Sequence, residues 1–462
     1  MKLLFFGRHW SYFRNFESAI AEMAARGHQV HMAVDVEEAL GGRQMIERLV
    51  ARYPDRLSMS NAPGRGLTAW TELARRIRHG LDYLRFLEPR YATKPHLTTR
   101  AKERAPRAIL ALLTIGYFRG ERGRRQLAAL LRAMERALPR SRDLEAFIAQ
   151  DNPDAVLITP LVDIGSRQLD YLRAAKALGL RTILPVGSWD HLSSKALLRI
   201  MPDAVLVWNE VQRQEAIEMH GVPPERVVVT GAQCYDQWWH RQPSRSRAEF
   251  CARVGLRPDR PFILYTCSSL FRDTYHEPTF VLEWIKAVRS STDPRLKDIG
   301  ILIRPHPSRL KEWQAVDLSG YRNLTFWGAH PVDADAKDDY YDSMAHSAAV
   351  VGLNTSAFLE AAIVGKPVFS ILDRSISTQN QEGTIHFHYL TDVNGGLLFT
   401  ARKWLAEDEN GNLVEQTFYK QHEVVVQRPM TVYRVTRNAK GDRSTGKGNP
   451  MKDFIVQPLT LG

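Results

Sequence analysis

A polar turn between two apolar runs contains the residues best suited to chemistry. The apolar runs predict buried strands, and Asn354, Thr355 and Ser356 open the helical stretch that lies between them. A helix N-terminus after a parallel strand offers free backbone N–H groups and a positive dipole end, which suit a phosphate or sugar hydroxyls. Glu360 follows Ser356 by four residues, so the two share a helix face. Its carboxylate can accept hydrogen bonds from a ribose diol.

A second candidate is the segment Arg304-Pro305-His306-Pro307, which follows an apolar run. Each proline pushes the residue before it into an extended conformation, and residues two apart in an extended segment point the same way. Arg304 and His306 are therefore predicted to project together, where a guanidinium and an imidazole suit a diphosphate. The alternative is a rigid loop with a surface arginine and histidine. The position at a strand end favours the functional interpretation.

Ser268 and Ser269 follow another apolar run, residues 262–267. Their hydroxyls could line a phosphate-binding loop in the way that glycines do in a dinucleotide-binding turn. A polar exit from a strand is also common without any ligand. The sequence leaves both interpretations open.

Three further candidates are acid or base groups. Asp190 and His191 follow the predicted strand 182–186, and His9 follows the first predicted strand of the chain. A carboxylate or imidazole at such a position could deprotonate an acceptor hydroxyl. Asp163 is a further alternative. For Asp190 the competing interpretation is a helix N-cap, a position that aspartate favours.

The elements that position these residues form two successive α/β series. A strand, a helix and a strand open the chain, which predicts a parallel sheet. We predict an N-terminal Rossmann-like domain over 1–240 with a helical insertion at about 65–150, and a second Rossmann-like domain over 259–400. Residues 401–462 are predicted to be a small extension, β-like or partly disordered. Ligands of paired sheets of this kind bind at the carboxyl ends of the strands, in a cleft between the domains.

Composition limits the location and the partners. The three cysteines form no pairwise motif, which argues against a disulfide scaffold and fits a reducing compartment. The apolar run at the N-terminus is too short for a signal peptide, and no run reaches the ~18 residues of a spanning helix. A cytoplasmic location is expected.

The net charge of +12 belongs to one segment. Residues 65–142 hold 19 Lys and Arg against 6 Asp and Glu, so the rest of the chain is nearly neutral. No nucleic-acid reader motif is present, so no nucleic-acid partner is expected. An apolar stretch at 108–118 flanked by arginines suits a helix in the headgroup region of an anionic membrane. The alternative is an arginine-rich insertion whose apolar side packs on its own domain.

Four motifs together resemble a known superfamily. They lie at 207–210 (Val-Trp-Asn-Glu), 229–232 (Val-Thr-Gly-Ala), 304–307 and 354–360. With them the chain resembles the two-domain glycosyltransferases of the GT-B type. It is most similar to bacterial surface-polysaccharide enzymes related to CDP-glycerol glycerophosphotransferases and UDP-N-acetylglucosamine 2-epimerases. The resemblance covers about 1–35 and 154–400.

The resemblance implies metal-independent transfer of a sugar or polyol-phosphate, without a cofactor, from a nucleotide-activated donor to a glycan or lipid-linked acceptor. It implies phosphate contacts from Arg304 and His306, phosphate or sugar contacts from Thr355 and Ser356, and a ribose contact from Glu360. The chain departs from the family because no final helix returning to the first domain is readable after residue 400. A nucleotide-sugar epimerase on the same fold and a non-catalytic nucleotide-sugar-binding protein remain as alternatives.

Overall fold

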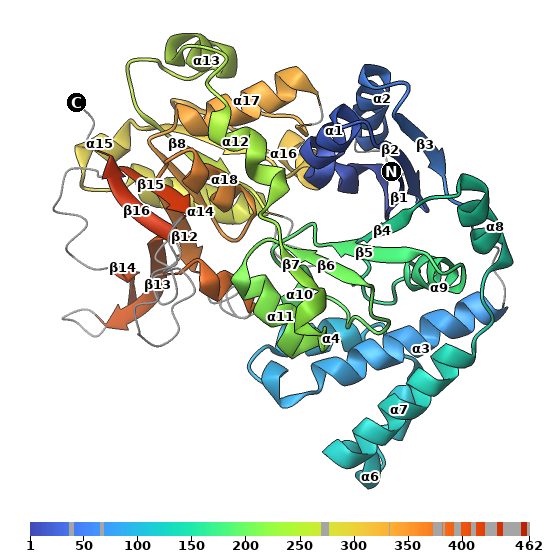
Figure 1. Cartoon of the computed structure of the whole chain (residues 1–462). Coiled ribbons are helices and arrows are strands. Elements are labelled where there is room, and N and C mark those ends of the chain that lie inside the picture. Colours follow the sequence, from blue (N-terminus) through green and yellow to red (C-terminus); the bar gives the residue numbers. More distant parts are fainter. Residues whose placement is uncertain are drawn as a thin grey trace. The chain divides into compact units, whose positions relative to one another are not determined.

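The computed structural model describes two compact units, Met1–Asp236 and Gln237–Gly462 (Figure 1). The residues that it describes are 1–36, 41–64, 69–268, 277–331, 333–372, 381, 384–391, 399–407, 413–420, 432–437 and 454–459.

Seven strands form the sheet of the first unit, in the order β3-β2-β1-β4-β5-β6-β7. Every neighbouring pair is parallel. The strands are β1 (Lys2–Gly7), β2 (Gln29–Val34), β3 (Leu57–Asn61), β4 (Ala155–Thr159), β5 (Arg181–Pro185), β6 (Ala204–Val207) and β7 (Val227–Val229). The central strands β1 and β4 are almost wholly buried, as expected of a parallel sheet that is covered on both faces.

Helices cover both faces of this sheet, and alternating residues of β1 show the two cores directly. Leu4 and Phe6 belong to one apolar cluster, whereas Leu3 and Phe5 belong to another. The covering elements are η1 (Trp10–Phe16), α1 (Glu17–Ala25), α2 (Gly42–Arg52), α8 (Arg142–Asp151), α9 (Leu169–Ala177), α10 (His191–Ser194) and α11 (Glu210–His220). The unit is therefore a doubly wound Rossmann-like domain.

The predicted basic insertion is helical, which confirms that part of the fold prediction. It comprises α3 (Ala69–Phe86), η2 (Pro89–Tyr91), α4 (Pro95–Lys102), α5 (Arg107–Leu112), α6 (Gly116–Arg119) and α7 (Glu121–Ala137). Helices α3 and α7 pack side by side (Figure 1). A buried ionic network joins them, because Arg78 of α3 pairs with Glu135 of α7 at 2.9 Å and with Asp170 of α9 at 2.8 Å.

The second unit is built on a sheet of order β10-β9-β8-β11-β12-β13-β14. Its strands are β8 (Phe262–Thr266), β9 (Gly300–Arg304), β10 (Leu324–Phe326), β11 (Ala349–Gly352), β12 (Val368–Leu372), β13 (Phe399–Glu407) and β14 (Leu413–Lys420). The first five are parallel, β13 adds in parallel to β12, and β14 is antiparallel. The predicted 401–462 extension thus supplies strands to the sheet edge. It also contains a separate antiparallel pair, β15 (Val432–Arg437) and β16 (Phe454–Leu459).

The helices of this unit include α14 (Glu277–Arg289), α15 (Pro294–Lys297), α16 (Leu310–Gln314), α17 (Ala334–Ala345) and α18 (Ala357–Ile363). The short 3-10 helices η5 (Pro307–Arg309) and η6 (His386–Tyr389) accompany them. The two parallel sheets with covering helices confirm the predicted α/β fold class and are consistent with the two Rossmann-like domains of a GT-B fold. The predicted cleft between the domains stays a prediction.

The sequence analysis leaves residues 241–258 outside both predicted domains, yet this segment is structured. It follows α12 (Asp236–His240) and contains α13 (Arg247–Val254). Arg245 and Arg253 each pair with Asp335 and Asp339 of α17, at 2.6–3.1 Å. These charges hold the segment against α17.

In the part of the chain that the structure describes, no helix combines the length and the apolar character needed to cross a membrane.

Candidate functional site

Two of the predicted base candidates lie around one tyrosine at the carboxyl edge of the first sheet. The rings of His9 and Tyr12 have centroids 4.6 Å apart, and those of Tyr12 and His191 are 6.3 Å apart. His9 precedes η1, which follows β1, and His191 opens α10 after β5. Since β1 and β5 flank β4 in the parallel sheet, their carboxyl ends share an edge, and the side chains meet there.

A close approach of η1 to the end of β1 depends on glycine. A Cβ atom at Gly7 would lie 2.9 Å from the ring of Phe13, which leaves no room for any other residue. The packing of Phe13 therefore fixes the turn that carries His9 and Tyr12.

Asp190 is held beside this group by hydroxyl and ammonium partners. Ser188 Oγ donates to Asp190 Oδ1 at 2.6 Å, and Lys195 Nζ lies 3.4 Å from Oδ2. Asp190 occupies the N-cap position of α10, as the alternative interpretation supposed, but its side chain makes no capping hydrogen bond there. Its carboxylate is half-buried and turned to neighbouring side chains instead.

Three further residues complete the group, which we call the edge cluster: Arg8, His9, Tyr12, Asp35, Asp163, Asp190 and His191. Arg8 Nη1 donates to Asp163 Oδ2 at 2.5 Å. Asp35 directly follows β2 and interacts electrostatically with Arg8, Arg167 and Asp163. Sequence reasoning missed Arg8, Tyr12 and Asp35. For Arg8 and Asp35, the one signal in the sequence was their position, because each is the first residue after a parallel strand.

Burial sets the protonation states of the edge cluster. It raises the pKa of Asp35 to about 6, although Arg167 and Arg8 oppose the shift. It lowers the pKa of His191, so the imidazole is neutral at pH 7. Burial and Asp163 raise the pKa of Tyr12, which stays protonated. Asp35 Oδ1 is buried and has no hydrogen-bond partner among the described residues. A carboxyl with a pKa near 6 is suited to take a proton from a hydroxyl near neutral pH.

In the second unit, a tyrosine links two of the predicted donor-binding residues. The guanidinium of Arg304, at the end of β9, lies 4.4 Å from the ring centroid of Tyr340 in α17. The Tyr340 hydroxyl donates to Glu360 Oε2 in α18. Arg304, Tyr340 and Glu360 therefore form one connected set, which we call the stacked triad.

Arg304 lies deeper than the sequence predicts. It is only 6% exposed, and its Nη2 donates to the Ala329 carbonyl at 2.9 Å. Burial lowers its pKa, while Tyr340 and nearby carboxylates oppose the shift. Nη1 is buried without a hydrogen-bond partner among the described residues. A Cβ at Gly328, where φ is +124°, would lie 2.4 Å from Nη1, so only glycine fits beside the guanidinium.

His306 differs from Arg304 in its surroundings. It is half-buried in the turn after β9, and its carbonyl accepts a hydrogen bond from Arg309 N at 2.8 Å. The joint projection of Arg304 and His306 toward a ligand stays a prediction.

The Asn354–Ser356 turn lies after β11, as predicted. Asn354 is buried, Thr355 Oγ1 accepts a hydrogen bond from Ala357 N at 3.3 Å, and Ser356 is exposed at the N-cap of α18. The carbonyl of Leu353 accepts hydrogen bonds from Ser370 Oγ at 2.5 Å and Gln381 Nε2 at 2.8 Å. These bonds anchor the start of the turn to the end of β12.

Ser268 is engaged inside the protein. It is 2% exposed, its backbone N–H donates to both carboxyl oxygens of Glu277 at 2.9 and 3.0 Å, and its hydroxyl lies 3.3 Å from Oε1. This bonding favours a structural role over the predicted phosphate contact. Ser269 lies outside the described residues.

Glu277 gives a pH-dependent stability that can be measured. Burial raises its pKa from an ordinary value of 4.5 to about 8. The folded protein thus keeps a proton that the unfolded chain has lost, so this contribution is complete below pH 4.5 and is lost as pH rises through 8. We expect the free energy of unfolding to fall by up to about 1.4 kcal/mol per pH unit across this window. Glu277→Gln should remove that slope in urea unfolding.

Glu283→Gln serves as the control, because Glu283 is an exposed carboxylate on the same helix. It should keep the wild-type slope. An unchanged slope in Glu277→Gln would contradict the assignment of the pH dependence to Glu277.

The chain was compared with protein-family models, curated proteins and solved structures. No protein-family model matches the sequence, and no curated protein matches it. Among solved structures, the chain is similar to the UDP-GlcNAc 2-epimerase of Methanocaldococcus jannaschii in complex with UDP-GlcNAc and UDP. The identity is 13%, 87% of this chain and 88% of that chain are covered, and the TM-score is 0.49.

Two other structures show the range of the likeness. The UDP-GlcNAc 2-epimerase of Neisseria meningitidis bound to UDP-GlcNAc has 12% identity, coverage of 80% of this chain and 82% of that chain, and a TM-score of 0.43. WaaG, a glycosyltransferase involved in lipopolysaccharide biosynthesis, has 13% identity, 86% coverage of both chains and a TM-score of 0.42. The solved structures that this chain resembles thus include epimerases and a glycosyltransferase, all at low sequence identity.

Proposed function

We propose that the protein is a glycosyltransferase that moves a sugar or polyol-phosphate from a nucleotide-activated donor to a hydroxyl of a glycan or lipid-linked acceptor. The observation that carries the proposal is the placement of chemically suited groups at the carboxyl edges of both sheets. The edge cluster offers a base for the acceptor hydroxyl. The stacked triad offers a positive charge and a carboxylate for the donor.

The donor side rests on the second unit. The buried guanidinium of Arg304 supplies positive charge for a leaving diphosphate. Its Nη1 has no hydrogen-bond partner among the described residues. Glu360 lies in the first turn of α18, after the polar turn of Asn354–Ser356. The hydrogen bond from the Tyr340 hydroxyl fixes the orientation of the Glu360 carboxylate, which suits recognition of a ribose diol.

A donor screen by thermal shift tests this assignment. A donor present at a hundred times its dissociation constant should stabilise the protein by about 2.7 kcal/mol. Glu360→Ala should lose this stabilisation, whereas Tyr340→Phe, which removes only the orienting hydroxyl, should lose part of it. Glu283→Ala is the control and should respond as the wild type does.

The outcome distinguishes several cases. Stabilisation by donors with one nucleobase, lost in Glu360→Ala, supports the stacked triad as the donor site. Equal stabilisation of wild type and Glu360→Ala would place the donor elsewhere. No shift with UDP-, GDP-, dTDP-, CMP- or CDP-linked compounds would contradict the proposal.

An epimerase is the second candidate, and the edge cluster favours it specifically. Tyr12 remains protonated while neutral His191 lies beside it, and an acid next to a base is what removal and return of a proton on one sugar requires. Incubation of the donor alone separates the two functions. Conversion to a second nucleotide sugar without acceptor would favour the epimerase, and turnover only with acceptor would favour the transferase. Tight donor binding without turnover would favour the non-catalytic alternative.

A further inference from the structure

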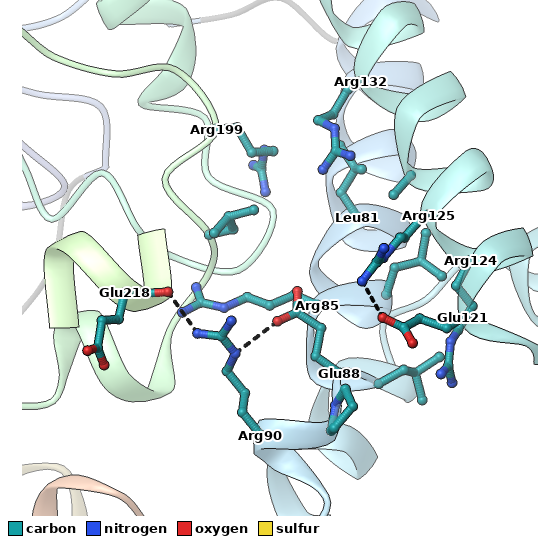
Figure 2. Close-up of a pocket in the computed structure, with 15 residues that line it drawn as sticks. Leu81, Arg85, Glu88, Arg90, Glu121, Arg124, Arg125, Arg132, Arg199 and Glu218 are labelled. Carbon is teal, nitrogen blue, oxygen red and sulfur yellow. Dashed lines mark hydrogen bonds and ion pairs between the residues drawn. The ribbon is translucent and has the colours of Figure 1, made fainter. Parts of the chain in front are cut away.

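A cavity of about 750 Å³ lies inside the first unit, within the basic insertion and its packing partners. Helices α3 and α7, the turn at η2 and the segment around Leu197 line it (Figure 2). One part of its wall is apolar, with Leu81, Leu84 and Leu87. The other part is charged, with six arginines against three glutamates. None of these residues belongs to the edge cluster.

Arg85 is a buried cation that has no carboxylate partner among the described residues. It is 3% exposed, and its guanidinium donates to the Tyr91 hydroxyl at 2.9 Å, the Lys195 carbonyl at 2.9 Å and the Leu192 carbonyl at 3.2 Å. His220 Nε2 lies 3.3 Å away, and burial together with Arg85 holds the pKa of His220 well below its ordinary value. Every partner is thus neutral. A buried charge is costly unless an opposite charge approaches it.

Other arginines around the cavity divide into two kinds. Arg90 pairs with Glu88 at 3.0 Å, and Arg125 pairs with Glu121 (Figure 2). Arg124 and Arg132 of α7 have no carboxylate partner among the described residues.

A further arginine, Arg199, also lines the cavity. Arg199 pairs with Asp82 at 2.6 Å and with Glu135 at 3.3 Å, and its Nη2 is buried with no hydrogen-bond partner in the described part of the chain. Its side chain is only 2% exposed. The cavity therefore presents an excess of positive charge, which suits a phosphate.

The same helical segment exposes large apolar side chains. Trp70 is 57% exposed, Ile115 50%, Tyr117 51% and Leu130 58%. Apolar and aromatic side chains interspersed with arginines are typical of helices that lie in the headgroup region of an anionic membrane. The surface therefore favours a lipid as the carrier of the phosphate.

We infer that this cavity binds the phosphate headgroup of an anionic lipid, with Arg85, Arg124 and Arg132 supplying the charge and the leucine wall contacting the start of the acyl chain. This site goes beyond the proposed transferase function. Binding here is independent of turnover and of the donor site, so a failure of one assignment leaves the other testable.

The first experiment compares two double variants of equal charge. Arg124→Gln/Arg132→Gln removes two arginines that line the cavity, and Arg122→Gln/Arg136→Gln removes two exposed arginines of the same helix that do not line it. Binding of monomeric dioctanoyl phosphatidic acid is measured by calorimetry. The cavity variant should bind at least about tenfold more weakly, while the control should bind within about twofold of the wild type.

A second pair of variants tests the apolar wall without altering charge. Ala128→Trp places a large side chain in the cavity, and Ala129→Trp places it on the exposed side of α7. Only Ala128→Trp should block phosphatidic acid. Circular dichroism confirms that each variant is folded.

Three results would overturn the inference. If both double arginine variants bound phosphatidic acid equally weakly, the binding would depend on the overall charge of α7 and not on the cavity. Inorganic phosphate binding as tightly as phosphatidic acid would make the cavity a site for a soluble anion. Undiminished binding to Ala128→Trp would place the lipid elsewhere.

Discussion

Replacing Asp35 with asparagine is expected to lower kcat by about 10²–10⁴-fold, the usual loss when a general base is removed. Burial raises the pKa of Asp35 to about 6, and Oδ1 has no hydrogen-bond partner in the described part of the chain. The base acts only when deprotonated. Wild-type activity should therefore fall as pH drops through about 6, and this acidic limb should be absent from the residual activity of Asp35→Asn. The measurement is a pH profile of kcat/KM with the identified donor and acceptor.

His191 and Asp190 provide the comparison, because both belong to the edge cluster but differ in their surroundings. The Asp190 carboxylate is already engaged by Ser188 and Lys195, so Asp190→Asn should retain the limb near pH 6. If the acidic limb of the kcat/KM profile persisted in Asp35→Asn and disappeared in His191→Gln, His191 and not Asp35 would be the base.

Replacing Arg78 with methionine is expected to destabilise the first unit by about 3–5 kcal/mol. The guanidinium makes two bonds of 2.8 Å to Asp170 and one of 2.9 Å to Glu135, and all three side chains are at most 5% exposed. The large loss arises because both carboxylates stay buried after losing this cation, although Glu135 still pairs with Arg199 at 3.3 Å. Chemical unfolding followed by circular dichroism measures the change.

Arg75→Met on the same helix is the matched control. Arg75 pairs with Glu72 at 2.8 Å, but both side chains are exposed, so the cost should stay within about 1 kcal/mol. Arg78→Met/Asp170→Leu should be more stable than Arg78→Met alone, since it also removes one of the two buried carboxylates that lose this cation. No gain in that double variant would show that the loss reflects packing and not charge.

The two sheets could be predicted because their strands are local signals. Apolar runs such as 349–353 and 300–304 are short, are bounded by turn residues and alternate with helical patterns, so the parallel order follows from general rules of chain connection. The same rules placed Asn354 and Arg304 at strand ends. What a strand-end residue contacts depends on other elements, and there the sequence was less informative.

The stacked triad illustrates this limit. Tyr340 comes from α17, which is separated from Arg304 by α16 and one strand, β10, and no spacing rule connects the two residues. Ser268 shows the same effect, because its partner Glu277 enters from the next helix. Asp35 was missed since a single carboxylate after a strand is common, and only burial distinguishes it. Contacts of this kind follow from packing between elements, which one sequence does not display.

The pairing between the 241–258 segment and α17 determines where the chain can be divided. A fragment beginning at the first strand of the second sheet would lack Arg245 and Arg253, so Asp335 and Asp339 would face each other without cations. Asp342 would be affected most, because it is fully buried and accepts hydrogen bonds from Ser244 N at 2.9 Å and Ser244 Oγ at 2.8 Å. A recombinant second domain should therefore begin before Arg241, which pairs with Asp338, and not at residue 261.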